Sequence, residues 1–132
     1  MSDNLYTVTT KVNVSLEEIA DLLCCGLEGG INYWASYKPG YVPTTEELTK
    51  YSSGSYKGLP EYTLEHPDYS LIIQDKNTEV EHRLNLKGLK LGLVDMASKF
   101  PRHFKEVIEY NCDAETGDVF LQCCVFGDII YG

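Results

Sequence analysis

Five cysteines and three histidines are the residues of this sequence best suited to nucleophilic or metal chemistry. They are Cys24, Cys25, Cys112, Cys123 and Cys124, with His66, His82 and His103. Neither vicinal cysteine pair has the Cys-x-x-Cys spacing of a zinc or thioredoxin site. Neighbouring helical residues point about 100° apart, so one cysteine of each pair faces away from any shared metal. No histidine stands at ligand spacing from a cysteine or a carboxylate, and we expect no metal, no cofactor and no enzymatic activity.

The cysteine count and the ends of the chain bear on compartment. An odd number of cysteines favours a reducing environment, in which free thiols pack as small apolar side chains. Residues 1–4 are polar and acidic and lack the features of a signal peptide. No apolar run approaches the roughly 20 residues that a membrane-spanning helix needs. We expect a cytoplasmic protein with no membrane partner.

Charge is segregated along the sequence. The whole chain has a formal net charge of −9, whereas residues 83–105 hold six Lys and Arg against one Asp. Such a segment attracts a small polyanion, while the acidic remainder repels a nucleic acid polymer. Arg102 follows a proline at an expected helix start, where free N–H groups and the helix dipole favour phosphate. Arg102 and His103 are therefore the leading anion-binding candidates, with Lys87 and Lys90 as further contacts; the alternative is a solvated helix face.

Three glycines, Gly26, Gly29 and Gly30, fall inside one expected helix. Gly26 and Gly30 are four residues apart and share a face, which permits close approach of a second backbone or of a flat ligand. One interpretation is packing against the C-terminal helix, which has its own glycines. The other is a floor for a bound ring beside Tyr33 and Trp34.

Helices are expected where apolar residues recur at helical spacing behind a capping residue. A capping box of Ser15 and Glu18 opens the first of these segments. The expected helices are 16–35, one after Asn85, one starting at Pro101 with Phe104, Val107 and Ile108 inward, and one after Asp113 whose core stripe reaches Ile130.

Strands are expected where β-branched and aromatic residues alternate with polar ones. The expected strands are 5–14, 62–65, 69–75 and 79–84, with turn chemistry at 75–78. Between them, 36–60 is rich in Gly, Pro, Tyr and Ser and predicts a long loop with one short helix near 45–51. The prediction is a single α+β domain over 1–132, a small antiparallel sheet with three to four helices packed on one side. Its apolar stripes and exposed aromatic residues also predict a homo-oligomer, at least a dimer.

Several motifs occur together in a fixed order. They are LEGGINYW at 27–34, FPRHF at 100–104, DAETGDVFLQ at 113–122 and FGDIIYG at 126–132. With these motifs the chain resembles a family of small proteins from tailed phages and prophages of Firmicutes, and it is similar to Thoeris anti-defence proteins that sequester immune signals. The resemblance covers both ends and most of 80–132, whereas 36–60 is specific to this chain.

The resemblance implies a function in the bacterial host cell. Proteins of the Thoeris anti-defence type bind cyclic ADP-ribose-type signals without cleaving them, as oligomers with aromatic and Arg side chains at subunit contacts. The leading hypothesis is therefore a phage-encoded protein that sequesters a small nucleotide-like ligand, with Arg102, His103, Lys87, Lys90, Tyr33, Trp34 and Gly30 as the binding residues. Two alternatives stay open: an acidic protein-binding inhibitor such as a DNA-mimicking anti-CRISPR, and a structural or regulatory phage protein.

Overall fold

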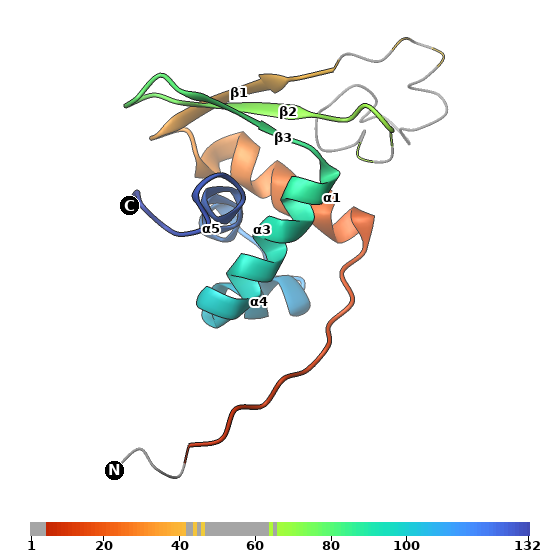
Figure 1. The fold of residues 1–132 in the computed structure, drawn as a ribbon, viewed down its shortest axis with the longest axis vertical. Coiled ribbons are helices and arrows are strands. Elements are labelled where there is room, and N and C mark those ends of the chain that lie inside the picture. The colour runs from red at the N-terminus through yellow and green to blue at the C-terminus, as the bar shows by residue number, and fades with distance from the viewer. Residues whose placement is uncertain (1–4, 42–43, 45, 47–63, 65) are drawn as a thin grey trace.

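A computed structural model describes residues 5–41, 44, 46, 64 and 66–132. In this part of the chain, three strands form one antiparallel sheet and four α-helices pack on one side of it, which confirms the predicted α+β fold (Figure 1). The elements in chain order are α1 Leu16–Cys25, the π-helical segment η1 Gly26–Gly30, β1 Ala35–Pro39, β2 Leu71–Asp75, β3 Glu81–Leu84, α3 Leu86–Lys99, α4 Pro101–Ile108 and α5 Ala114–Phe126.

The sheet has the order β1-β2-β3, with β2 in the centre. Leu71 and Ile73 of β2 are fully buried, because this strand faces the helices. The expected turn at 75–78 is confirmed: Asp75 Oδ1 accepts hydrogen bonds from the backbone N–H groups of Asn77 at 2.8 Å and Thr78 at 3.3 Å. These bonds hold β2 and β3 in register.

The helix starts follow the expected capping residues. Ser15 Oγ accepts from Glu18 N at 3.1 Å, and the Glu18 carboxylate reaches back to Ser15 N. Asn85 Oδ1 accepts from Gly88 N at 2.9 Å at the start of α3. Asp113 caps α5, and Pro101 occupies the first turn of α4. The side chains of Ser15, Asn85 and Asp113 each supply an acceptor that the first helical N–H groups lack.

The predicted strand at 5–14 is wrong. Residues 5–14 form an extended arm with no regular secondary structure, which runs from α1 away from the sheet (Figure 1). Tyr6 is 87% and Val8 is 86% exposed. The alternation of apolar residues in this arm is that of a strand, but no strand among the described residues pairs with it.

The first helix ends earlier than predicted. It loses helical geometry at Glu28 and Gly29, and Ala35 already belongs to β1. The last helix ends at Phe126, because Gly127 adopts φ 71°, a left-handed cap. Local spacing missed both ends because the apolar pattern continues through the turns that follow.

Three smaller expectations have mixed outcomes. Ile108 is 44% exposed and does not point inward, whereas Val107 is buried. The expected strand 62–65 and the short helix 45–51 lie almost entirely outside the described residues. Among the helices of the described chain, none combines the length and apolar character that crossing a membrane requires.

Candidate functional site

The glycine face is a helix-packing surface. A Cβ atom at Gly26 would lie 2.5 Å from Leu121 Cδ1 and 2.9 Å from the carbonyl oxygen of Gly117. A Cβ atom at Gly30 would collide with the backbone of Ala114. The packing interpretation is therefore confirmed, and α1 with η1 lies in close contact with α5.

The alternative, a glycine floor for a bound ring, is not supported. Trp34 has no exposed surface, and its indole stacks on Tyr131 with ring centroids 5.4 Å apart. Gly30 is buried beneath α5. A ligand ring cannot reach either residue in this structure, so both leave the set of candidate contacts.

Tyr33, although 54% exposed, is tied to the same interface. Its hydroxyl donates to Asp118 Oδ2 at 2.6 Å, and Trp34 Nε1 donates to Asp118 Oδ1 at 2.8 Å. Partial burial, the hydrogen bond to Asp118 and the negative charge of that carboxylate raise the pKa of Tyr33 to about 12. The exposed edge of Tyr33 stays accessible to a ligand, but its hydroxyl is already used.

A buried glutamine extends this network to the C-terminal tail. Gln122, which is 1% exposed, donates from Nε2 to Asp118 Oδ1 at 3.0 Å and to the carbonyl oxygen of Tyr131 at 3.1 Å. Its Oε1 accepts from the N–H groups of Ile130 at 2.8 Å and Tyr131 at 2.9 Å. One side chain therefore makes four hydrogen bonds, with Tyr33 Oη as a longer contact of Nε2 at 3.3 Å, and fixes the tail on α5.

The tail is also joined to the sheet. Tyr131 Oη donates to Asp75 Oδ2 at 2.7 Å. Burial by itself would raise the pKa of Asp75, but the hydrogen bonds from Tyr131, Asn77 and Thr78 outweigh it and hold the pKa below its usual value. Sequence reasoning did not predict this network, although the spacing of Asp118 and Gln122 on the buried side of α5 was a signal for it.

The basic segment does not converge on one point. Lys87 and Lys90 lie exposed in the first turns of α3, whereas Arg102 lies beyond its end. A 14-residue helix is about 21 Å long. Along the helix axis, Lys87 lies about 18 Å and Lys90 about 14 Å before the last residue of α3, so Lys87 is not expected to share one small diphosphate with Arg102.

Other cations of the segment already have partners. Arg83 donates to Ser70 Oγ at 2.8 Å and to the carbonyl oxygen of Gly40 at 3.2 Å. Lys99 Nζ donates to the carbonyl oxygen of Gly127 at 2.6 Å. These two side chains connect elements of the fold, and we assign them no ligand role.

Arg102 is exposed in the first turn of α4. The residue at the N-cap, Phe100, makes no side-chain capping bond, so the helix start lacks the oxygen acceptor that α1, α3 and α5 have. Within the part of the chain that the structure describes, the Arg102 guanidinium has no ion-pair partner. Charge and helix start therefore favour an anion at the same place.

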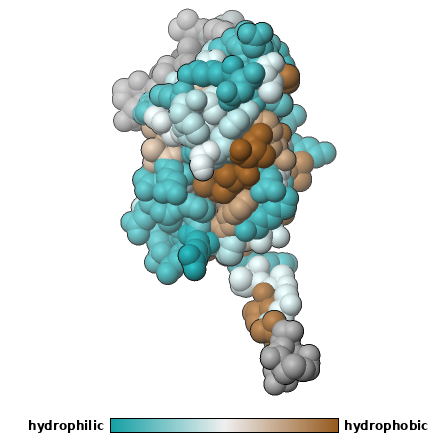
Figure 2. Space-filling view, turned by 90° about the vertical axis from the view of Figure 1, so that its left-hand side faces the viewer, coloured by the Kyte–Doolittle hydropathy of each residue, from teal (hydrophilic) through white to brown (hydrophobic). Residues whose placement is uncertain are grey.

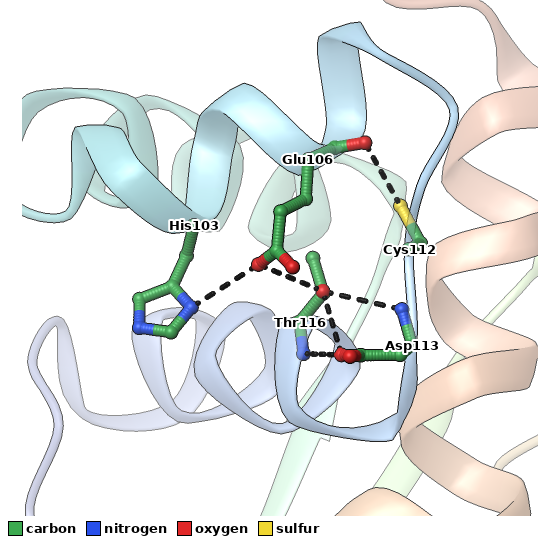
Figure 3. A network of polar contacts seen from close by, with 5 residues as sticks. All are labelled: His103, Glu106, Cys112, Asp113 and Thr116. Atoms are coloured by element: carbon green, nitrogen blue, oxygen red, sulfur yellow. Dashed lines mark hydrogen bonds and ion pairs between the residues drawn. The ribbon is translucent and has the colours of Figure 1, made fainter.

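His103, beside Arg102, belongs to a polar network (Figure 3). Its Nδ1 lies 3.4 Å from Glu106 Oε1, and Thr116 Oγ1 lies 3.1 Å from the same oxygen. Thr116 also exchanges hydrogen bonds with Asp113, the cap of α5. The network joins α4 to the start of α5, and the second imidazole nitrogen of His103 points away from it (Figure 3). Glu106 competes with any external anion for His103, so Arg102 is the stronger candidate.

A pocket of about 270 Å³ lies between α1 and the segment after α4. Its lining is Glu18, Asp21, Cys24, Cys25, Val107, Tyr110 and Cys112. Burial, with nearby thiols and carboxylates, raises the pKa of Cys112 to about 11, and burial with the charge of Asp21 also raises the pKa of Cys25. Protonated thiols are poor nucleophiles, and the two carboxylates disfavour a phosphate in this pocket.

None of the five cysteines forms a disulfide in the described chain; Cys123 is buried and the other four are partly buried. Among the described residues, no three His, Cys, Asp or Glu side chains cluster in a way that could hold a metal ion. Comparisons with protein families, with curated proteins and with solved structures found no match to this chain.

Proposed function

We propose that this chain is a phage-encoded anti-defence protein that binds and sequesters a nucleotide-derived signal of the cyclic ADP-ribose type without cleaving it. The observation that carries the proposal is Arg102, an exposed guanidinium without an ion-pair partner in the described chain, at a helix start without a side-chain cap. The resemblance to phage anti-defence proteins supplies the class of ligand. Sequestration needs affinity and no catalytic group.

The contact expected at Arg102 is charge-assisted. A diphosphate oxygen would accept from the Arg102 guanidinium and from the Arg102 backbone N–H, because Pro101 has no N–H and the N–H of His103 already donates to the carbonyl oxygen of Phe100. The outward nitrogen of His103 would also donate when the imidazole carries both protons, since Nδ1 faces the Glu106 carboxylate. One such contact is worth about 1.5–3 kcal/mol. Nanomolar affinity corresponds to about 12 kcal/mol, so further contacts are required, and a second subunit is their expected source.

Calorimetric titration with cyclic ADP-ribose isomers and cyclic oligonucleotides tests the proposal. Arg102→Ala should weaken binding by about tenfold or more, which corresponds to about 1.4 kcal/mol. Lys87→Ala is the matched control, because it removes an exposed cation in the first turn of α3, at the opposite end of that helix from Arg102, and it should change the affinity less than about threefold. If no ligand binds more tightly than about 10 μM, the sequestration function is rejected. Such a dissociation constant corresponds to only about 7 kcal/mol, well below the value for nanomolar binding.

A second candidate, an acidic inhibitor that binds a protein, is favoured by the surface of α1. Partial burial and the charges of Glu17 and Glu18 raise the pKa of Asp21, which shows that three carboxylates crowd one stretch of this helix. If this candidate is right, the native chain should inhibit DNA binding by a CRISPR effector complex in a competition assay. The double variant Glu17→Gln, Asp21→Asn should then lose inhibition, while Arg102→Ala keeps it.

A further inference from the structure

The N-terminal arm, residues 5–14, has the surface of a strand and none of its pairing. Tyr6, Val8 and Val12 lie on one side of an extended chain, with the β-branched Thr10 in the same register. Leu5 is 80% exposed and Val12 is 43% exposed. β-branched and aromatic residues favour a pleated, half-buried surface, which this arm does not find in the part of its own chain that the structure describes.

The sheet offers an open edge at β3. The N–H of Asp75 donates to the carbonyl oxygen of Val80 at 3.0 Å, so alternate residues from Val80 onward face β2. The backbone groups of Glu81 and Arg83 consequently point to the outer side of β3. Within the described chain, those N–H and C=O groups have no hydrogen-bond partner, which is the usual template for an added strand.

The other edge, at β1, is less suited to pairing. Pro39 has no N–H, and the N–H of Ala35 already donates to the carbonyl oxygen of Ile31 at 2.9 Å. Ala35 and Pro39 are two of the three residues whose backbone groups face outward on β1, and neither can therefore donate a hydrogen bond to a new strand. The open edge at β3 is the better acceptor.

We propose that the N-terminal arm adds as a fourth strand to the β3 edge of a second copy of this chain. The arm leaves α1 on the side away from its own sheet, and Figures 1 and 2 both show it projecting from the body. Its direction favours exchange between two copies over folding back.

The area involved fits a stable dimer. An extended chain exposes about 1.45 Å² per dalton, so ten residues of about 113 Da each expose about 1,600 Å². Burial of half of each arm in a reciprocal exchange, with equal area on the acceptors, gives about 3,000 Å², above the 1,200–2,000 Å² of a standard interface. The arm carries Lys11 and no acid, so it also meets an otherwise acidic chain without charge repulsion.

Sedimentation equilibrium of the full chain tests the exchange. The native protein should have twice the 14.9 kDa chain mass at micromolar concentration. Deletion of residues 1–14, which keeps the Ser15 cap, should give a folded monomer. A native chain that stays monomeric at about 100 μM, or a truncated chain that stays dimeric, overturns the proposal.

Point variants on the two sides of the arm keep the test independent of truncation. Val8→Asp with Val12→Asp places charge on the apolar side and should raise the dimer dissociation constant by about 100-fold or more. Thr7→Asp with Thr9→Asp makes the same charge change on the opposite side and should raise it less than about threefold. Equal effects of the two pairs would show that the arm does not bind as a strand with one buried side.

The acceptor edge is tested with a backbone change. Glu81→Pro removes one outward N–H from β3, whereas Glu81→Ala removes the same side chain and keeps the N–H. Only the proline variant should dissociate the dimer.

A photo-crosslinker at Tyr6, in a mixture of ¹⁴N- and ¹⁵N-labelled chains, should join peptides of different label at β3. Crosslinks within one chain would exclude the β3 edge of a second copy as the acceptor. Crosslinks to Leu91 and Val94, two exposed apolar residues of α3, would exclude it as well.

Discussion

The interface between α1, η1 and α5 and the basic surface of α3 and α4 use their residues in opposite ways. In the interface, Gly26 and Gly117 bring two backbones together, and the Gln122 side chain contacts four other residues. On the basic surface, Lys87, Lys90 and Arg102 are exposed and contribute little to the fold.

The difference separates two kinds of sequence signal. A glycine in a helix costs up to about 1 kcal/mol relative to alanine, so its presence needs a compensating contact, and here that contact is a neighbouring helix. An exposed lysine or arginine costs almost nothing, so its presence alone does not identify a ligand. Substitutions in the two regions should therefore differ strongly in their effect on stability.

The largest effect is expected at Gly117. In Gly117→Ala, the new Cβ would lie 2.6 Å from Gly26 Cα, and backbone atoms cannot move aside cheaply. We expect a loss of about 3 kcal/mol or more in the free energy of unfolding, measured by urea denaturation. Gly29→Ala is the matched control, because nothing lies within 4 Å of its Cβ position. If Gly117→Ala is as stable as this control, the close approach of Gly117 to Gly26 does not contribute to the stability of the interface.

A somewhat smaller loss is expected at Gln122. Gln122→Leu keeps similar volume but leaves the N–H groups of Ile130 and Tyr131 without an acceptor. Two unsatisfied buried donors would cost about 2–6 kcal/mol in total, at about 1–3 kcal/mol each. Because Ile130 is 54% exposed and water can reach its N–H, we expect the lower part of that range, a loss of about 2–4 kcal/mol, and faster hydrogen exchange in the tail. Gln74→Leu, in which one long bond of 3.4 Å is lost, should cost less than about 1 kcal/mol. Similar losses at both positions would contradict the role of Gln122 as an anchor.

Much of the fold could be predicted from sequence, because caps and apolar periodicity are local. Ser15, Asn85 and Asp113 each mark the start of a helix that the structure contains. The arm was misassigned because alternation reports the surface that a strand needs and not whether a partner strand exists. The close approach of Gly26 to α5 was one of the two interpretations of the glycine face that the sequence left open, and the structure selects it.

The candidate site was much less predictable. Trp34 was expected to be part of a binding surface, but its indole N–H pairs with Asp118, 84 residues further along the chain. Lys87 and Arg102 share a basic segment in sequence, yet a helix separates them in space. Both errors have one physical cause: convergence of side chains is a property of tertiary packing, which neither spacing nor composition reports.

The pairing of the tail with β2 should appear in the dependence of stability on pH. Hydrogen bonds to the carboxylate hold the folded pKa of Asp75 below its ordinary value of 3.8. Its contribution to stability is therefore present above the unfolded pKa and is lost as pH falls through the folded pKa. Asp75→Asn should make the acid limb of the stability curve shallower, as measured by thermal unfolding from about pH 2 to 6. Asp68→Asn, which changes an exposed carboxylate, is the control; an unchanged acid limb in Asp75→Asn would show that the tail is held by other contacts.

The smallest effect on the free energy of unfolding is expected on the basic surface of α3 and α4. Arg102→Ala and Lys90→Ala should each change the free energy of unfolding by less than about 0.5 kcal/mol, because neither side chain holds two elements together. Lys99→Ala tests the same surface at a structural position, since it removes the bond from Lys99 Nζ to the carbonyl oxygen of Gly127. We expect it to cost about 1 kcal/mol. If Arg102→Ala is as destabilising as Lys99→Ala, then Arg102 stabilises the fold and is no longer a candidate ligand contact. If Arg102→Ala is neutral for stability while it weakens nucleotide binding, the charge at the start of α4 is there for an external partner.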